Sequence, residues 1–411
     1  MTRFTAWSLL AVFGIGVFLA GLELMITATA LPSILLDLAA TDQLGKPAFS
    51  ELRHASWILN GYLLAYVVAM PLAGRLADVW GTRRLFLAAL VIFIGGSLVA
   101  GRAQSIDELI LGRVIQGIGG GVLVPVGTAA ASHLFEGHDR PRALGIIGAL
   151  TFLGMAAGPF LGAAILGGLD VGSGLDRLGI APGSPLHDAL APAWRWVFYI
   201  NVPIGLVALF IAWAASHGWE TPRRRTGLDA FGALIWSVAL AAALGATTLI
   251  GVSYIGGPDP LVVGAGLAAL AGLATLLTIA RGLRRAEPFL DPRLFRSAAF
   301  SSAALVSLLT GFAFAVAIIG GAVFVDRVLY GGPDDQRLAL GALAAATALG
   351  ALISGFAVRV LSLRLVTLVG LLVCAACLGL MSRWTPAVGI GQVALTLGAF
   401  GLGFGLTVTP R

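Results

Sequence analysis

The sequence predicts an all-helical protein that crosses a membrane about twelve times. Of its 411 residues, 58% are hydrophobic and only 11% are charged, whereas a soluble globular protein carries about 25% charged residues. The apolar residues gather in runs of about 20, the length that a helix needs to cross a hydrocarbon core about 30 Å thick. The 56 glycines are scattered through these runs, as in membrane helices whose backbones approach closely. A soluble fold is therefore excluded.

Charged or Gly- and Pro-rich breaks separate twelve apolar runs. The first starts just after Arg3 and reaches Pro32; it is longer than the apolar region of a signal peptide, about 7–15 residues, so we interpret it as a retained span. A long outer loop rich in Gly, Pro and Asp, 168–193, precedes the sixth run, and the sequence assigns it no role. The predicted spans are 7–32, 56–74, 85–101, 109–133, 143–166, 194–216, 229–251, 260–280, 299–325, 338–358, 364–382 and 387–408.

The positions of the charges predict the orientation of these spans. Of the 26 Lys and Arg residues, 17 fall on the side of the amino terminus and 8 on the opposite side, while Arg113 lies inside a span. Because cytoplasmic loops are enriched in Lys and Arg, we expect a multi-pass protein of the cell (inner or plasma) membrane with a cytoplasmic amino terminus. The basic residues form no contiguous face, so no nucleic-acid partner is expected despite the net charge of +6.

Residues suited to enzymatic or metal chemistry are sparse. The five histidines fall at span ends or in loops, and no cluster of His, Asp or Glu lies at membrane depth, as an embedded active site would need. Cys374 and Cys377 share one apolar run and lack a second Cys or His pair that could complete a metal site. We interpret them as helix-packing residues and expect neither an enzyme nor a bound metal.

The two halves of the sequence contain a repeat. The segment Gly74–Arg83 after the second span resembles Gly355–Arg364 after the tenth, where Arg359 replaces Asp78. Alternate glycines of the fourth span recur in the twelfth span, at nearly the same displacement along the chain; these are Gly117, Gly119 and Gly121, matched by Gly401, Gly403 and Gly405. The near-equal displacements predict two pseudo-symmetric helix bundles, in which spans nine to twelve match spans one to four.

This register divides the chain into three predicted domains. Residues 1–218 form an N-terminal six-helix bundle, residues 219–298 form an inserted two-helix segment with a cytoplasmic linker, and residues 299–411 form a C-terminal bundle of four helices. Partners for the fifth and sixth spans are missing from the second bundle. We therefore expect the sequence to be about two helices short of a complete second bundle.

Five short motifs occur in order along the chain. They are Ala30-Leu31-Pro32 at the end of the first span; Gly74, Leu76, Ala77, Asp78, Gly81, Arg83 and Arg84 in the loop after the second; Arg113, Gln116, Gly117 and Gly119 in the fourth; Gly154, Gly158, Pro159 and Gly162 in the fifth; and Trp194–Gly205 at the entry to the sixth. Together they resemble the major facilitator superfamily, specifically its fourteen-span drug:proton antiporter branch, over essentially the whole chain. Two positions depart from the pattern: Val79 stands where a basic residue is common, and Ala163 replaces the last glycine of the fifth-span motif.

The resemblance implies a transporter fold and roles for two of the motifs. The loop after the second span would be a gating loop that forms a charge-relay latch between the halves. Asp78 would lie at a helix N-terminus, where the helix dipole favours an anion, and Arg83 and Arg84 would lie near opposing carbonyls. A solvated charge cluster that sets topology is the alternative. The fifth-span motif would make an antiporter-type helix, although Gly154 and Gly158, four residues apart, permit close helix packing in their own right.

Two charged residues lie inside the predicted spans. Glu23 is the only one of the 20 acids well inside an apolar run, and Arg113 lies near the outer start of the fourth span. A charge in the bilayer must pair or face water, and the two residues lie at compatible depths. We therefore expect Glu23 and Arg113 to couple transport to protons, because protonation of Glu23 weakens its tie to Arg113 and shifts the inward–outward equilibrium. The alternatives are an acid that caps packing contacts and an arginine that extends to the surface.

Several polar and aromatic residues within the spans are candidates for a substrate cavity. Mixed apolar and aromatic walls suit amphipathic or cationic ligands, although most aromatic residues of membrane helices face lipid or other helices. The substrate-binding candidates are Asn60, Tyr62, Tyr66, Gln116 and Phe152.

The sequence thus predicts a proton-coupled secondary transporter that exports hydrophobic or cationic small molecules by alternating access, as in multidrug efflux. A lipid or lipid-conjugate exporter of the same fold is the nearest alternative, which lateral clefts open to lipid would favour over a closed central cavity. A non-transporting membrane sensor or scaffold is an alternative of another class. The expected partners are the bilayer and a small substrate, the expected energy source is the proton gradient without any cofactor, and the expected state is a monomer.

Overall fold

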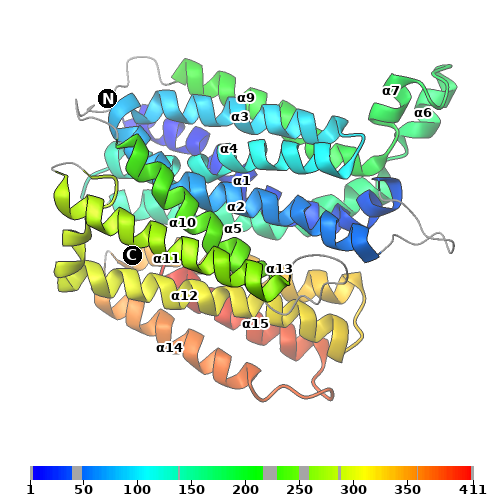
Figure 1. Cartoon of the computed structure of the whole chain (residues 1–411). Helices are drawn as coiled ribbons and strands as arrows, with labels where there is room; N and C mark the ends of the chain where they lie inside the picture. Colours follow the sequence, from blue (N-terminus) through cyan, green and yellow to red (C-terminus); the bar gives the residue numbers. More distant parts are fainter. Residues whose placement is uncertain are drawn as a thin grey trace.

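The computed structural model describes residues 3–38, 49–137, 139–215, 229–249, 259–285, 288–358 and 360–408, and within these ranges it contains helices and connecting turns but no strand. Ten of the described helices are long and apolar enough to cross a membrane, and two shorter apolar helices cover Phe231–Thr247 and Ile390–Leu406. Each of the twelve predicted spans coincides with one of these helices. The all-α membrane fold is therefore confirmed (Figure 1).

The bounds of the helices are α1 Arg3–Leu38, α2 Phe49–Trp80, α3 Thr82–Arg102, α4 Ile106–Leu134, α5 Asp139–Gly168, α6 Val171–Arg177, α7 Pro185–Leu190, η1 Ala193–Arg195, α8 Trp196–Tyr199, α9 Asn201–Ala215, α10 Ala230–Leu249, α11 Pro260–Arg284, η2 Pro292–Arg296, α12 Ala298–Val323, η3 Phe324–Val328, α13 Pro333–Ala357, α14 Leu363–Met381 and α15 Ile390–Leu406. Helices α1 to α5 extend beyond the predicted apolar runs because their polar ends continue the helical backbone, whereas α10 and α15 are shorter than their runs.

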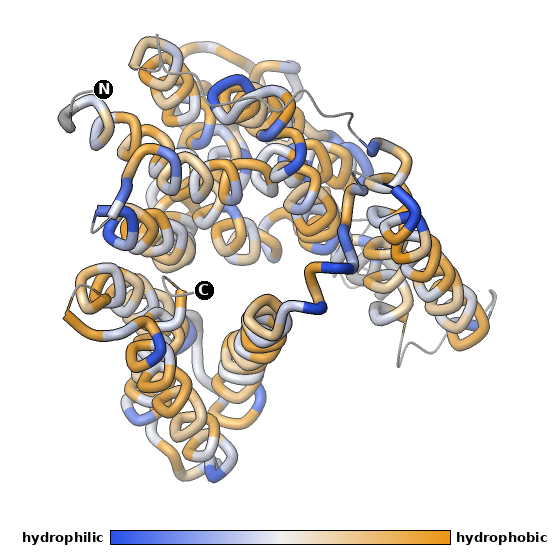
Figure 2. Tube along the Cα trace, turned by 90° about the vertical axis from the view of Figure 1, so that its left-hand side faces the viewer, coloured by the Kyte–Doolittle hydropathy of each residue, from blue (hydrophilic) through white to orange (hydrophobic). Residues whose placement is uncertain are grey.

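Both ends of the described chain lie at the same end of the molecule, which we call the N face, and α6 and α7 lie at the opposite end, the far face (Figure 1). Figure 2 looks onto the N face and shows hydrophobic residues along most of the helices, with hydrophilic residues gathered near helix ends. The segment 168–193, predicted as a loop, contains α6 and α7. Trp196 and Tyr199 hold it in place, because their side chains donate to the carbonyls of Leu190 (2.8 Å) and Ala189 (3.1 Å).

The glycines that indicated a repeat make equivalent contacts in the two halves. A Cβ atom added to Gly121 would lie 2.3 Å from the Tyr66 carbonyl oxygen, and one added to Gly405 would lie 2.2 Å from the Thr347 carbonyl oxygen. Thr347 stands as far after Tyr66 as Gly355 stands after Gly74 in the repeated segment. In both halves, therefore, the glycine backbone of one helix touches the backbone of its neighbour, α4 against α2 and α15 against α13.

The middle glycine of each trio faces the third helix of its bundle. A Cβ atom at Gly119 would lie 2.7 Å from the Ala89 carbonyl oxygen on α3, and one at Gly403 would lie 3.0 Å from the Gly370 carbonyl oxygen on α14. Ala89 and Gly370 are again separated by the displacement of the repeated segment. The same three-helix packing is thus built twice, in the register that the sequence indicated.

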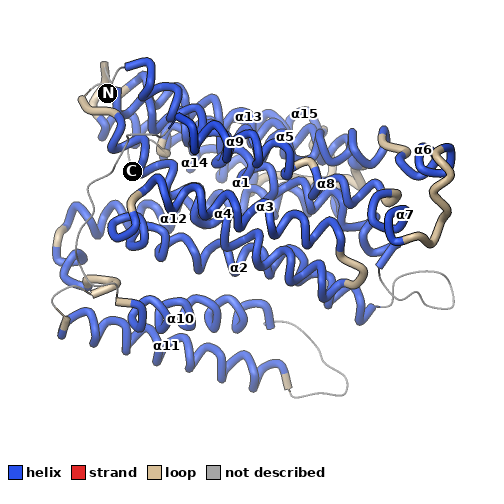
Figure 3. Tube along the Cα trace, turned by 90° about the horizontal axis from the view of Figure 1, so that it is seen from above, coloured by secondary structure: helices blue, strands red, loops and turns tan. Residues whose placement is uncertain are grey.

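The helix pair α10 and α11 lies side by side along the flank of the molecule (Figure 3). The two helices follow the first bundle and precede α12, as expected for an insertion between the bundles. The predicted boundary between residues 218 and 219 lies outside the described residues, so the division into three domains stays a prediction.

We expect Gly121→Val to disrupt the α4–α2 contact, because its side chain would overlap the backbone of Tyr66. Overpacking of this kind costs at least about 1–3 kcal/mol, which thermal unfolding of the purified protein in detergent would measure. Gly95→Val on α3 is the matched control, since a Cβ atom there has no neighbour within 4 Å. Equal unfolding temperatures for the two variants would contradict the backbone contact.

Candidate functional site

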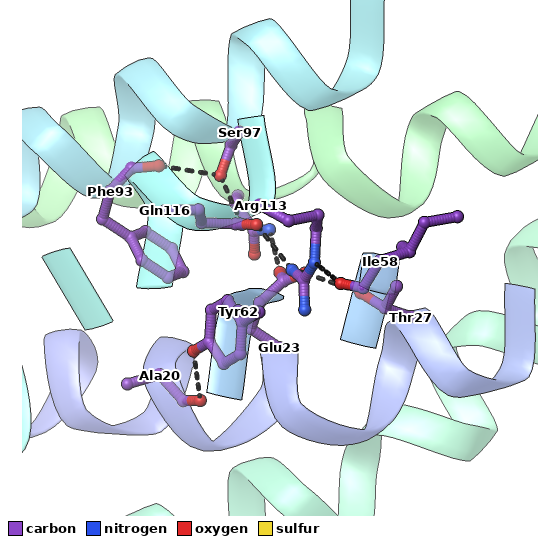
Figure 4. Close-up of polar contacts among 10 residues, drawn as sticks. Ala20, Glu23, Thr27, Ile58, Tyr62, Phe93, Ser97, Arg113 and Gln116 are labelled. Carbon is purple, nitrogen blue, oxygen red and sulfur yellow. Dashed lines mark hydrogen bonds and ion pairs between the residues drawn. The ribbon is translucent and has the colours of Figure 1, made fainter. Parts of the chain in front are cut away.

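Glu23 and Arg113 form an ion pair inside the first bundle (Figure 4). The side chains are 0% and 1% exposed, and Arg113 Nη1 contacts Glu23 Oε1. Glu23 lies in the middle of α1, and Arg113 lies two turns into α4. Neither charge reaches solvent, so the alternatives of an interfacial acid and of an arginine extending to the surface do not fit the structure.

The remaining acceptor capacity of Glu23 is used by two uncharged donors. Thr27, one turn later on α1, donates its hydroxyl to Glu23 Oε1 at 2.8 Å, and Asn201 Nδ2 on α9 donates to Oε2 at 2.5 Å. Asn201 is itself fully buried, and its Oδ1 has no hydrogen-bond partner. A buried carboxylate is costly unless its lone pairs accept hydrogen bonds. Donors on α1, α4 and α9 supply these hydrogen bonds to Glu23.

Arg113 makes further contacts through its N–H donors and through the planar face of its guanidinium group. Its Nε donates to the Ile58 carbonyl oxygen at 3.1 Å, and its Nη1 donates to Gln116 Oε1 at 2.6 Å. The guanidinium lies 4.1 Å from the centre of the Tyr62 ring, a cation–π contact (Figure 4). Because the guanidinium binds α1, α2 and its own helix at once, its position depends on how these helices pack.

The network continues from Gln116 to α3. Gln116 Nε2 donates to Ser97 Oγ at 2.8 Å, and the Ser97 hydroxyl donates to the Phe93 carbonyl oxygen at 3.0 Å. Gln116 and Ser97 are both fully buried. We call Glu23, Thr27, Tyr62, Ser97, Arg113, Gln116 and Asn201 the charged network.

Asn201 is the member that sequence reasoning missed. It belongs to the motif Trp194–Gly205, which assigns it no role, and it lies 178 residues from Glu23 in the sequence. Pro203 follows two residues later, in the first turn of α9, where the missing N–H of proline costs no helical hydrogen bond. The chain breaks at Ile200, between α8 and α9, and Asn201 begins α9 beside Glu23. An amide at a helix start within an apolar run was the available signal.

In the described part of the second half, residues 299–358 and 360–408, no buried charged residue corresponds to this network. Leu397 and Phe400 stand as far after Arg113 and Gln116 as Gly401 stands after Gly117, and both are fully buried in an apolar core. The packing repeats, but the buried charges do not.

The predicted gating loop lies at the N face. Gly81 separates α2 from α3 with a φ of 84°, which favours glycine, while Gly74 is exposed. Asp78 lies in the last turn of α2, so its expected position at a helix N-terminus is wrong: the helix continues to Trp80. Arg83 Nη2 lies 3.5 Å from the Trp213 carbonyl oxygen near the end of α9, where the helix dipole favours a cation. Arg84 is exposed.

The glycines of the fifth-span motif pack α5 against α1. Added Cβ atoms would lie 2.2 Å from the Phe18 carbonyl oxygen at Gly154, 2.8 Å from Met25 Cβ at Gly158 and 3.1 Å from Thr29 Cβ at Gly162. The close helix packing expected from these residues is therefore present. Their role in antiport stays a prediction.

α5 also carries the contact between the two halves. Near the N face, a Cβ atom at Gly145 would lie 2.8 Å from the Ala351 carbonyl oxygen and 3.0 Å from Gly355 Cα on α13. Toward the far face, the halves separate around a cavity of about 340 Å³ whose lining includes Met25, Thr29, Pro159 and Arg337. The halves are thus closed together near the N face and apart near the far face.

A narrower cavity of about 20 Å³ lies beside the first and shares Met25, Pro159 and Leu340 with it. Its walls are apolar and include Met155 on α5 and Phe314 on α12. These cavities lie on the opposite side of α1 from the charged network, because Met25 follows Glu23 by two residues, about 200° around a helix with 3.6 residues per turn.

The five substrate-binding candidates lie in different surroundings. Gln116 and Tyr62 belong to the charged network, Tyr66 is buried and stacks on Tyr62, and Asn60 is partly exposed on α2. Phe152 on α5 packs against Phe314 and Phe404 of the second half. Only Phe152 reaches the interface between the halves, and the substrate role of all five stays a prediction.

A family model described as "Major Facilitator Superfamily" matches residues 13–410. The chain belongs to this superfamily. It is accordingly a multi-pass membrane transporter rather than an enzyme, as expected. Among the described residues, no group of three or more His, Cys, Asp or Glu side chains could hold a metal ion, and the Cys374 and Cys377 side chains are buried.

Characterised members of the superfamily resemble this chain over nearly all of its length. A triacylglyceride transporter of Mycolicibacterium hassiacum is 32% identical over 97% of this chain and 70% of that protein. Multidrug resistance protein 3 of Bacillus subtilis is 27% identical over 100% of this chain and 72% of that protein. The structure of the xylose transporter XylE from E. coli aligns with a TM-score of 0.54 at 14% identity, covering 98% of this chain and 85% of that chain, a likeness of fold alone.

We expect Glu23→Ala to destabilise this transporter by about 3–5 kcal/mol, because it leaves the Arg113 guanidinium buried without its counter-ion. Thermal unfolding in detergent would measure the loss. Asp334→Ala is the control, since it breaks an ion pair with Arg337 in which the Asp334 side chain is 92% exposed, and exposed pairs contribute little. Equal small losses in both variants would mean that the buried pair does not stabilise the bundle.

Proposed function

We propose that this superfamily member exports hydrophobic or cationic small molecules in exchange for protons, and that Glu23 is the proton-binding residue. The observation that supports this most is the fully buried Glu23–Arg113 pair, because an ionisable residue at membrane depth is costly to retain without a function. We call the two adjoining cavities between the halves the inter-half cavity. The smaller one has apolar walls and the larger one bears Asp326 and Arg337, a combination that suits amphipathic substrates.

A proton on Glu23 changes the forces on three helices. The charged carboxylate accepts hydrogen bonds from Arg113 on α4, Thr27 on α1 and Asn201 on α9. Neutralising it removes the Coulomb attraction to Arg113, which is strong at low dielectric, while Arg113 keeps the Ile58 carbonyl and Gln116. The tie between α1 and α4 therefore weakens, which favours a shift of α1 relative to α4.

Asn201 can serve both protonation states of Glu23. Its Nδ2 donates to the carboxylate, and its Oδ1 is buried without a partner. After a half-turn of the amide, Oδ1 would accept the hydroxyl hydrogen of the protonated Glu23 carboxyl. An amide carries both a donor and an acceptor, so the same side chain holds Glu23 in place before and after proton binding.

Helix α1 connects the proton site to the substrate path. Glu23 faces the charged network, Met25 and Thr29 line the inter-half cavity, and glycines of α5 touch the backbone of α1. A movement of α1 on protonation therefore changes the cavity and the α5–α13 contact that closes the N face. One proton crossing 100 mV supplies about 2.3 kcal/mol for such a cycle.

The rival function is export of lipids or lipid conjugates. The relative from M. hassiacum is named a triacylglyceride transporter, and a lateral cavity of about 670 Å³ lies between α3, α4 and α7 at the far face. Its lining includes the exposed apolar residues Leu98 and Leu111.

The alternative of another class is a membrane sensor without transport activity. Substrate-dependent proton release from the purified protein distinguishes the two, because a proton-coupled transporter produces it and a sensor does not.

We expect Glu23→Gln to abolish proton-driven efflux of a cationic dye from proteoliposomes while preserving dye exchange without a gradient, because the amide keeps the size of the carboxyl but cannot be protonated. Arg337→Gln at the cavity is a control that leaves the proton site intact, so its efflux remains dependent on the gradient. Full proton-driven efflux by Glu23→Gln would falsify the role of this residue.

Drug and lipid export are separated by supplying both substrates to the same vesicles. We expect a proton gradient to drive dye across the membrane at least about tenfold faster than a fluorescent triacylglycerol. The cavity between the halves is small, about 340 Å³, and the carboxylate of Asp326 in its wall can attract a cation but not a neutral lipid. Competition between the two substrates, with faster lipid transfer, would instead establish the lipid function.

A further inference from the structure

A second buried carboxylate lies outside the spans, at the start of α10. The Asp229 side chain is 2% exposed, and its oxygens accept hydrogen bonds from Arg281 Nη2 (2.8 Å), the Gly232 amide (3.0 Å) and the Phe289 amide (3.2 Å). Arg285 Nη1 lies 2.8 Å from Asp229 Oδ1. One carboxylate thus binds the first turn of α10, the end of α11 and the linker between α11 and α12.

Asp229 stays ionised at neutral pH. Burial favours its neutral form, but the hydrogen bonds from Arg281 and from the backbone amides of Gly232 and Phe289 outweigh burial and hold the pKa of Asp229 below its usual range. A depressed pKa means that the contribution of these contacts to stability is present at neutral pH and is lost only as the pH falls through the lowered value.

The same linker binds the end of α2. Arg75, which follows Gly74 in the predicted gating loop, donates from Nη2 to the Pro288 carbonyl oxygen and from Nε to the Phe289 carbonyl oxygen, the latter at 3.4 Å. Phe289 therefore gives its N–H to Asp229 and its C=O to Arg75. A single residue of the linker connects the inserted helix pair with the gating loop of the first bundle.

Beyond Phe289 the chain remains packed on α11 until the second bundle begins. A Cβ atom at Gly282 would lie 2.5 Å from both the Leu290 carbonyl oxygen and Pro292 Cδ, and Arg293 Nη2 donates to the Leu283 carbonyl oxygen at 3.2 Å. α12 then starts at Ala298. The chain that enters the second bundle is thus held from α2 and from α11 at once.

We propose that Asp229 and Arg75 form a clamp that fixes the linker to the end of α2, so that the second bundle rocks against the first about this point. Both are positioning residues for alternating access. The inserted pair α10–α11 holds Asp229 in place, because Asp229 lies at the start of α10 and pairs with Arg281 at the end of α11. The inference rests on the alternating-access step of the proposed function, but it does not depend on proton binding by Glu23.

The test compares Asp229→Asn, Arg75→Gln and the double variant with Asp291→Asn. Asp291 lies in the same linker and accepts a hydrogen bond from the Arg293 amide at 3.0 Å, but it contacts neither Asp229 nor Arg75 in the described structure. Dye binding to purified protein, dye exchange in proteoliposomes without a gradient and spin-label distances between Trp80→Cys and Leu361→Cys would be measured. These label sites are exposed, at 52% and 45%, whereas Cys374 and Cys377 are buried.

We expect each clamp variant to slow dye exchange about tenfold, which corresponds to the loss of one hydrogen bond to a charged group. The distribution of spin-label distances should broaden, and the affinity for the dye should stay within about twofold of the unsubstituted protein. The double variant should be no slower than the slower single variant, because both substitutions open one clamp. Asp291→Asn should behave as the unsubstituted protein.

Two results would overturn the clamp. One is a wild-type exchange rate in Asp229→Asn and Arg75→Gln. The other is a lower unfolding temperature with unchanged exchange per folded molecule and unchanged distances, which describes contacts that only stabilise the fold. Because exchange without a gradient does not require titration of Glu23, a failure of proton coupling remains distinguishable from a failure of the clamp.

Discussion

The ion pair between Glu23 and Arg113 is the constraint on which the first bundle depends. Two buried charges are tolerable only when their remaining donors and acceptors are paired. Thr27 and Gln116 supply partners from α1 and α4 themselves, and the Ile58 carbonyl and Asn201 supply partners from α2 and α9. The packing of α1, α2, α4 and α9 therefore does two things: it buries apolar side chains, and it brings the partners of the ion pair within hydrogen-bonding distance. Any change of charge at Glu23 is felt by all of these helices together.

The twelve spans and the Glu23–Arg113 pair could be predicted because each follows from a local rule. Long apolar runs must be helices in lipid, and two lone charges at similar depth have few partners besides each other. The constant displacement between the repeated segments also anticipated which backbones meet, as Gly121–Tyr66 and Gly405–Thr347 demonstrate.

Contacts between residues that are far apart in the sequence could not be predicted from local rules. Asn201 meets Glu23 across 178 residues, and Phe289 meets Asp229 across 60; nothing in their own neighbourhoods specifies the partner. The placement of Asp78 failed for a different reason, because α2 continues through the loop motif to Trp80. Gln116 and Tyr62 are predicted as cavity residues because polar and aromatic side chains suit ligands. The structure shows that both contact Arg113, and their role in substrate binding stays a prediction.

The methionines of the inter-half cavity bear on how this transporter could change over evolutionary time. Met25 and Met155 are unbranched and adapt their shape to different neighbours, and they line the cavity near Gly154 and Gly158, where an added Cβ atom would overlap the backbone of α1. Because we propose that substrates bind in this cavity, exchange of a wall residue is expected to change which substrates fit. Substitution of these glycines would instead disrupt the packing of α5 on α1, so changes of specificity are expected at the walls rather than at the glycines.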